Sequence, residues 1–353
     1  MSLSSYLSPT RLLEGYLRRC LTAAGLTSQT LSIDSETTIH FWGPSSVDHS
    51  IDDRPVMLLL HGFGPSAMWQ WRRQIQAFSP SVFRVYCPDL VFFGDSTTSS
   101  TNRSEVFQAE CMAKLMEKLG IEKKFNVVGT SYGGFVAYHM AKMWPEKVEK
   151  VVIASSGINM RTCDSESLLQ RSNCECIEKV MLPSTASELR TLMGLASSWR
   201  MLRMFPDALW NDFISNLYQK NRKEKVELLK GLTLGREEKL NIEPLSQVRA
   251  SLLLNTRDVI PNMSWDVFQI KRSLLLSSNN EYEYLNGSHM INGILIIWGD
   301  KDQIFPVKMA YELKEILGDK TKLEIIENTS HIPQIECAQE FNNVVLRFLK
   351  GSQ

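Results

Sequence analysis

Five consecutive residues, Gly129-Thr130-Ser131-Tyr132-Gly133, have the spacing of a nucleophile elbow, the sharp turn that presents a catalytic serine. They lie between an expected strand at 125–128 and a helical pattern, which is the strand–turn–helix context that the motif requires. The turn is so tight that Gly129 and Gly133 must lack side chains, and the helix N-terminus adds positive potential beside the serine. The motif therefore predicts that Ser131 is a nucleophile.

A serine hydroxyl is a weak nucleophile without a general base, and the chain offers six histidines. His331 lies in a loop after the last expected strand, where the base of such a site belongs. His40 and His49 precede the elbow, His139 lies in the helix that follows it, and His289 lies in an irregular stretch. We therefore predict that His331 takes the serine proton.

The third member of such a site is a buried carboxylate that orients the imidazole. Asp300 and Asp302 both follow the expected strand at 294–298. Asp302 lies farther out in the loop and can reach under His331, whereas Asp300 is better placed to cap the turn. We predict a triad in the chain order Ser131, Asp302, His331.

The sequence His61-Gly62-Phe63-Gly64 follows an apolar run at 56–60. Gly62 and Gly64 would let backbone amides approach a substrate carbonyl, and we expect the amides of Phe63 and Tyr132 to hold the oxyanion. His61 is expected to be a structural turn residue. The loop at 89–96 is expected to shape the pocket at the sheet edge.

Short β-rich runs alternate with helical patterns, which indicates an α/β fold with a mostly parallel sheet. The run at 56–60 is apolar at every position, as is typical of a strand covered on both faces. Helical spacing predicts helices at 104–119, ended by Gly120, and at 135–143 and 338–349. The expected strands are 30–34, 37–42, 56–61, 83–88, 125–129, 150–154, 294–298 and 323–326.

The same patterns divide the chain into segments. We expect a helical segment at 1–27, an α/β core at 28–156 and 293–353, and a helical cap at 157–248 whose apolar residues line an apolar pocket. Residues 249–292 are rich in Asn and Ser and have no periodicity. We interpret them as an insertion foreign to the pattern, of the kind that a gene-model or splicing artefact would leave.

Composition narrows the classes of function. The 353 residues carry 39 basic and 39 acidic side chains, and this neutral balance argues against a nucleic-acid partner. No apolar run reaches the roughly 18 residues of a transmembrane segment, and the seven scattered cysteines suggest no disulfide framework, so we expect a cytoplasmic protein. The segment at 1–27 suits a helix docked on the domain; contact with a membrane surface, or an organellar transit peptide, is the alternative.

Taken together, the motifs H-G-F-G, D-L-V-F-F-G-D-S, G-T-S-Y-G-G and W-G-D-K-D-Q-I-F-P resemble the α/β-hydrolase superfamily, in the branch with a helical cap after strand six. The chain is similar to plant serine hydrolases related to monoacylglycerol-lipase-like and esterase-like enzymes. The resemblance covers residues 25–248 and 293–350 and implies an eight-stranded, mostly parallel sheet with helices on both faces. It departs at Ser330, where such proteins usually have Gly before the catalytic His.

These observations predict a serine hydrolase that cleaves a small apolar carboxylic ester through an acyl-enzyme, with no metal and no cofactor. One alternative is a ligand receptor on a hydrolase scaffold, with little or no turnover. Another is a C–C bond hydrolase or lyase that uses the same triad. An epoxide hydrolase or dehalogenase is disfavoured because the elbow carries Ser where that chemistry needs a carboxylate. The oligomeric state stays open.

Overall fold

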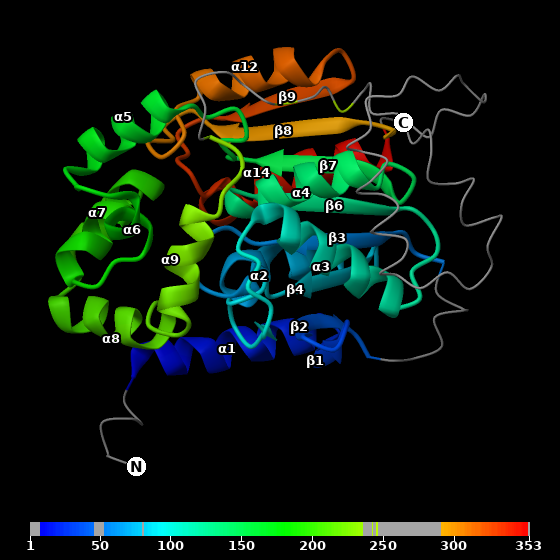
Figure 1. Ribbon diagram of the computed structural model, residues 1–353, viewed down its shortest axis with the longest axis horizontal. Helices are drawn as coiled ribbons and strands as arrows, with labels where there is room; N and C mark the ends of the chain where they lie inside the picture. The colour runs from blue at the N-terminus through cyan, green and yellow to red at the C-terminus, as the bar shows by residue number, and fades with distance from the viewer. Residues whose placement is uncertain are drawn as a thin grey trace.

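The computed structural model describes residues 8–45, 53–79, 81–235, 242, 245 and 291–351. Eight strands lie side by side in the order β1-β2-β4-β3-β6-β7-β8-β9, and the short β5 pairs with β2 (Figure 1). β2 is antiparallel to β1, β4 and β5, and all the other pairs are parallel, which confirms the predicted architecture. The strands are β1 (Leu26–Ser32), β2 (Thr37–Pro44), β3 (Val56–Leu60), β4 (Arg84–Pro88), β5 (Thr97–Thr98), β6 (Phe125–Thr130), β7 (Val148–Ala154), β8 (Ile294–Gly299) and β9 (Thr321–Ile326).

The predicted first strand, 30–34, is misplaced. β1 begins at Leu26, two residues before the expected start of the core at 28, and it ends before Asp34. Asp34 Oδ1 accepts hydrogen bonds from the amides of Glu36 and Thr37, at 3.0 and 2.8 Å, so this aspartate closes a turn. The other predicted strands agree with the structure to within two residues at each end, and β5 was not predicted.

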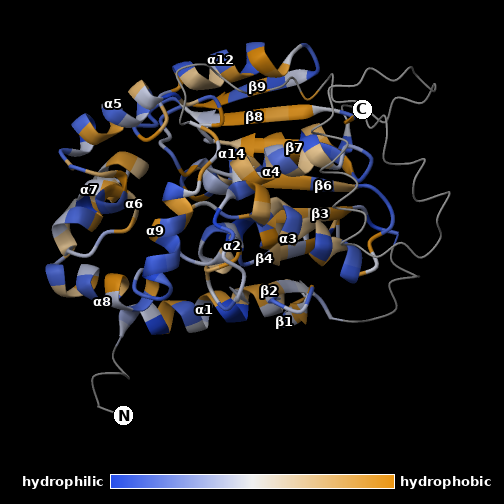
Figure 2. Cartoon of the chain, viewed as in Figure 1, coloured by the Kyte–Doolittle hydropathy of each residue, from blue (hydrophilic) through white to orange (hydrophobic). Residues whose placement is uncertain are grey.

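Helices cover both faces of the sheet, and the alternating side chains of β3 show why. Leu58 and Leu60 pack against α3 (Glu105–Lys118), α4 (Tyr132–Met143) and α12 (Lys308–Leu317). Met57 and Leu59 point to the opposite face, toward α1 (Pro9–Ala23), α2 (Ala67–Phe78) and α14 (Ala338–Lys350). Both faces are therefore apolar, and the central strands are mostly hydrophobic (Figure 2).

After β7 the chain forms a group of helices at one end of the sheet (Figure 1). They share an apolar cluster that also includes Ile304, from the loop after β8. Of the predicted cap at 157–248, the structure describes residues up to 235 together with 242 and 245, and of the predicted insertion it describes only 291 and 292. The elements are α5 (Thr162–Ser172), α6 (Ile177–Met181), α7 (Ala186–Ala196), η2 (Arg200–Met204), α8 (Asp207–Leu217) and α9 (Arg222–Lys230).

Helix α1 docks on the domain. Its residues Leu17 and Leu21 are buried against the core, and the amide of Thr10 donates to Asp212 Oδ2 in α8 at 2.9 Å. Leu12 and Tyr16 remain 66 % and 51 % exposed. No helix in the described part of the chain is long and apolar enough to cross a membrane.

Candidate active site

Ser131 lies between β6 and α4 in a backbone conformation that only a tight turn enforces. Its φ is 49°, a left-handed value that side chains rarely adopt. A Cβ at Gly129 would lie 2.1 Å from the Gly133 carbonyl oxygen, and one at Gly133 would lie 2.2 Å from the Leu60 carbonyl oxygen. Both glycines are therefore required by close backbone approach.

The loop after β9 brings His331 to this serine, although 200 residues separate the two. His331 Nδ1 lies 2.9 Å from Asp302 Oδ2, and Nε2 lies 2.9 Å from Ser131 Oγ. Because a carboxylate can only accept, Nδ1 carries the proton and Nε2 accepts from the serine hydroxyl. All three residues are buried. The arrangement can pass a proton from Ser131 to an imidazole whose cation faces a carboxylate.

The two candidate aspartates lie in different positions. Asp302 Oδ1 accepts from the amides of Ile304 and Phe305, each at 2.9 Å, which leaves Oδ2 aimed at His331. Asp300 Oδ1 accepts from the Thr329 amide at 3.0 Å and so joins the two loops. The carboxylate behind the imidazole is thus that of Asp302.

The turn after β3 lies against the elbow, since a Cβ at Gly62 would meet Ser131 Cβ at 3.0 Å. Gln70 braces this turn: its Oε1 accepts from the Gly62 amide at 2.8 Å, and its Nε2 donates to the Gly62 and Pro65 carbonyls. The amides of Phe63 and Tyr132 have no acceptor among the residues that the structure describes. These two N–H groups are available to a substrate oxygen.

His61 is fully buried and lies in the turn. Its Nε2 accepts from the Leu90 amide at 3.0 Å, so Nδ1 donates to the Gly62 carbonyl at 2.8 Å. Burial lowers the pKa of His61, and nearby Lys225 lowers it further, against the opposing effect of Asp89. A neutral imidazole therefore ties the loop after β4 to the turn after β3.

A carboxylate that the sequence analysis did not single out fastens the His331 loop to the helical segment. Glu336 Oε2 accepts from the Ser330 amide at 2.7 Å. Glu336 Oε1 accepts from the hydroxyl of Ser197 at 2.5 Å and from the amide of Ser198 at 2.6 Å. The His331 amide also donates to the Ala196 carbonyl at 3.1 Å. No local motif pairs residue 336 with residue 197, so only the fold reveals this contact.

Ser330, which stands where the resemblance leads us to expect glycine, also connects the His331 loop to the helical segment. Its hydroxyl lies 3.0 Å from the Leu195 carbonyl and 3.2 Å from the Lys301 carbonyl. A glycine here would lose these bonds. The serine therefore adds a further link between α7 and the loop that carries His331.

A pocket of about 260 Å³ opens onto Ser131 and His331. Its walls come from the helical segment, with Leu189, Leu192 and Phe205, and from the core, with Trp69 and Ile335. In the described part of the chain, no Lys, Arg, Asp or Glu side chain lines it. We call it the apolar pocket; it suits a hydrocarbon group beside the serine. No group of three or more His, Cys, Asp or Glu side chains in the described ranges could hold a metal ion.

Several known hydrolases are similar to this chain. The chain is 25 % identical over 303 residues to a 2-hydroxy-6-oxononadienedioate/2-hydroxy-6-oxononatrienedioate hydrolase of Burkholderia vietnamiensis, covering 84 % of this chain and 87 % of the relative. It is 25 % identical over 307 residues to a monoacylglycerol lipase of Mus musculus, covering 84 % and 76 %. A 2-hydroxy-6-oxo-6-phenylhexa-2,4-dienoate hydrolase from Rhodococcus sp. superposes with a TM-score of 0.63 at 19 % identity, covering 92 % of this chain and 99 % of the other.

The family model described as alpha/beta hydrolase fold matches residues 55–338, a range that holds the elbow, the Asp302 loop and the His331 loop. The match thus spans most of the chain and includes every residue of the hydrogen-bonded chain at Ser131. On this evidence, the chain belongs to the alpha/beta hydrolase fold family.

Proposed function

We propose that this protein is a serine hydrolase that cleaves carboxylic esters with an apolar acyl or alkyl group. The hydrogen-bonded chain Ser131–His331–Asp302, placed at the end of the apolar pocket, carries the proposal. The narrower resemblance to plant monoacylglycerol-lipase-like and esterase-like enzymes is part of this proposal.

In the proposed reaction, Ser131 Oγ attacks the ester carbonyl carbon while His331 Nε2 takes the hydroxyl proton. The carbonyl oxygen becomes an oxyanion that the amides of Phe63 and Tyr132 hold. Collapse of the intermediate breaks the carbon–oxygen bond, and His331 returns the proton to the departing alkoxide. A water molecule then repeats the sequence and releases the acid, while Asp302 stabilises the imidazolium in both halves.

A second candidate, hydrolysis of a C–C bond, is favoured by the similarity to dienoate and dienedioate hydrolases over most of the chain. The same residues could activate a water or attack a ketone carbonyl. The apolar pocket argues for the ester, because within the described residues its walls beside Ser131 carry no Lys, Arg, Asp or Glu and suit a hydrocarbon group.

The test is labelling with a fluorophosphonate probe followed by turnover. Wild type and Ser172→Ala should be labelled, whereas Ser131→Ala should not; Ser172 is a buried serine of α5 that does not line the apolar pocket. Turnover of a series of aliphatic esters should exceed that of a 2-hydroxy-6-oxo-dienoate. The reverse order would favour C–C hydrolysis, labelling without turnover would favour a ligand receptor, and an unlabelled wild type would contradict the proposal.

Peripheral contact with a membrane belongs to the same proposal. Met201 and Met204 of η2 are 74 % and 83 % exposed, and Leu202 of the same element lines the apolar pocket. Lipid contact at η2 would bring an apolar ester to the pocket. Met204→Ser should weaken co-sedimentation with phosphatidylcholine vesicles, whereas Tyr311→Ser, at an exposed position on α12, should not.

A further inference from the structure

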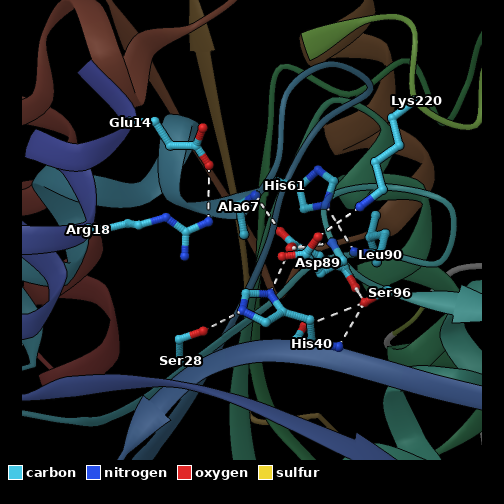
Figure 3. Close-up of polar contacts among 11 residues, drawn as sticks. Glu14, Arg18, Ser28, His40, His61, Ala67, Asp89, Leu90, Ser96 and Lys220 are labelled. Carbon is cyan, nitrogen blue, oxygen red and sulfur yellow. Dashed lines mark hydrogen bonds and ion pairs between the residues drawn. The ribbon is translucent and has the colours of Figure 1, made fainter. Parts of the chain in front are cut away.

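A second cavity, of about 190 Å³, lies next to the apolar pocket. Gly64, Trp69 and Leu217 line both. Its other walls come from α1, β2, α2, the loop after β4, and the segment from the end of α8 into α9. We call it the polar cavity, because charged side chains surround it. Figure 3 shows several of them gathered around Asp89.

Most of the charges that line the polar cavity are already paired with one another. Both carboxylate oxygens of Asp89 accept hydrogen bonds. Its Oδ1 accepts from the Ala67 amide at 2.8 Å, and its Oδ2 accepts from His40 Nδ1 at 2.8 Å and from the Asp95 amide at 3.3 Å. Burial raises the pKa of Asp89, but the hydrogen bond and charge of His40 outweigh it, so the group stays ionised. The ion pairs at the cavity are Arg18–Glu14 at 3.0 Å, Lys220–Asp95 at 2.7 Å and His40–Asp89 at 2.8 Å (Figure 3).

Lys225 is the exception. It lines the polar cavity, is only 3 % exposed, and lies over the ring of Phe93 with Nζ 5.0 Å from the centroid. No carboxylate oxygen in the described ranges lies within ion-pair distance of its Nζ. Burial lowers the pKa of Lys225 to about 8, with a further contribution from the charge of Lys220, so the amine is still mostly protonated at neutral pH. A buried cation without a partner costs free energy unless something supplies the negative charge.

We propose that the polar cavity binds the negatively charged group, a carboxylate or a phosphate ester, of an amphiphilic ligand whose hydrocarbon part lies in the apolar pocket, with Lys225 as the counter-ion. Asp89 fills this role only in part: its charge raises the pKa of Lys225, but its oxygens accept from other groups and lie beyond ion-pair distance of Lys225 Nζ. Gly64 adjoins Phe63, whose amide faces the reacting carbonyl in the proposed reaction. The inference rests on the proposed function to the extent that this ligand is the ester substrate or its product.

Equilibrium binding tests the proposal without depending on turnover. Octanoate, octyl phosphate and 1-octanol are titrated by calorimetry into wild type, Lys225→Met, Lys225→Gln and Lys223→Met. Lys223 is an exposed lysine of the same helix and serves as the matched control. The wild type should bind at least one anionic probe about tenfold or more tightly than octanol, the size of one charge-assisted hydrogen bond. Whichever anion binds better identifies the source as carboxylate or phosphate.

The preference should disappear in both Lys225 variants and persist in Lys223→Met. Equal affinity of wild type for all three probes would overturn the proposal. So would an anion preference that survives in Lys225→Met, because the anion would then be held elsewhere, for instance by the Phe63 and Tyr132 amides. Ser131→Ala should bind the probes like wild type, so a failure of the ester chemistry stays separate from a failure of the anion site.

Discussion

The buried charge of Lys225, which has no ion-pair partner among the residues that the structure describes, should make the protein less stable than it could be. The difference between the ordinary lysine pKa of 10.5 and about 8 corresponds to about 3 kcal/mol of unfavourable free energy for the charged amine in the folded state. Lys225→Met removes this cost and keeps an apolar stem in the same space. It also removes the contact of the amine with Phe93, which is worth about 1 kcal/mol. The variant should therefore be more stable by about 2 kcal/mol at neutral pH.

The sign of the pH dependence follows from the lowered pKa. Below about pH 8 both the folded and the unfolded chain carry the charge, so the full penalty is present. Between that pH and 10.5 the unfolded chain binds more protons, so the contribution of Lys225 to wild-type stability improves as pH rises. The advantage of Lys225→Met should therefore shrink over this range.

Urea unfolding followed by tryptophan fluorescence, at neutral pH and at about pH 10, measures this difference. Lys223→Met, at an exposed position in the same helix, should change the free energy of unfolding by less than about 0.5 kcal/mol at either pH. The reasoning is refuted if Lys225→Met destabilises the protein at neutral pH, or if its advantage does not depend on pH. Gained stability with lost anion binding would show that the lysine is kept for the ligand rather than for folding.

Three further predictions concern groups around the elbow and the core. Asp302→Asn should lower kcat on an aliphatic ester by about 10³-fold or more with little change in KM, because an amide no longer holds His331 in the right tautomer; a loss below tenfold would contradict the triad. Glu336→Gln should lower kcat about tenfold, because the charged hydrogen bond from the Ser330 amide is weakened. The control Glu340→Gln, at an exposed position of α14, should leave kcat unchanged. Equal effects of the two substitutions would argue against positioning of the His331 loop by Glu336. Burial raises the pKa of Glu105, but the interactions of His139 and Thr233 with the ionised carboxylate outweigh this and lower the pKa below its usual 4.5. The ionised Glu105 therefore stabilises the folded protein above that pH, and this contribution is lost as the pH falls. In Glu105→Gln, the free energy of unfolding measured by circular dichroism should therefore depend less steeply on pH in the acid range than in wild type. Identical acid profiles of the variant and the wild type would refute this.

Much of the fold and of the site could be predicted where the signal is local. The elbow depends on Gly129, Ser131 and Gly133, which are near neighbours in the chain, and their steric requirement is visible in the sequence. The run of apolar residues at 56–60 likewise predicts a strand that is buried on both faces. The first strand was misplaced because β1 is an edge strand whose outward residues are polar, so its periodicity is weak.

Other features could not be predicted because their partners are far apart in the sequence. Glu336 meets Ser197 and Ser198 across about 139 positions, and nothing in either segment marks the other. Whether Asp300 or Asp302 faces His331 depends on how two loops fold over the sheet edge. Lys225 looks like any lysine on a helix until its burial is known.

Local patterns were enough to predict the α/β architecture, the proposed nucleophile and the chain order of the proposed triad, since hydrophobic periodicity and tight-turn sterics act between residues close in sequence. Only the folded arrangement shows which charges are paired and that Lys225 has no ion-pair partner within the described ranges. The electrostatic free energy of a side chain depends on the surroundings that distant segments build around it, and the polar cavity that Lys225 lines combines α9 with α1, β2, α2, the loop after β4 and the end of α8.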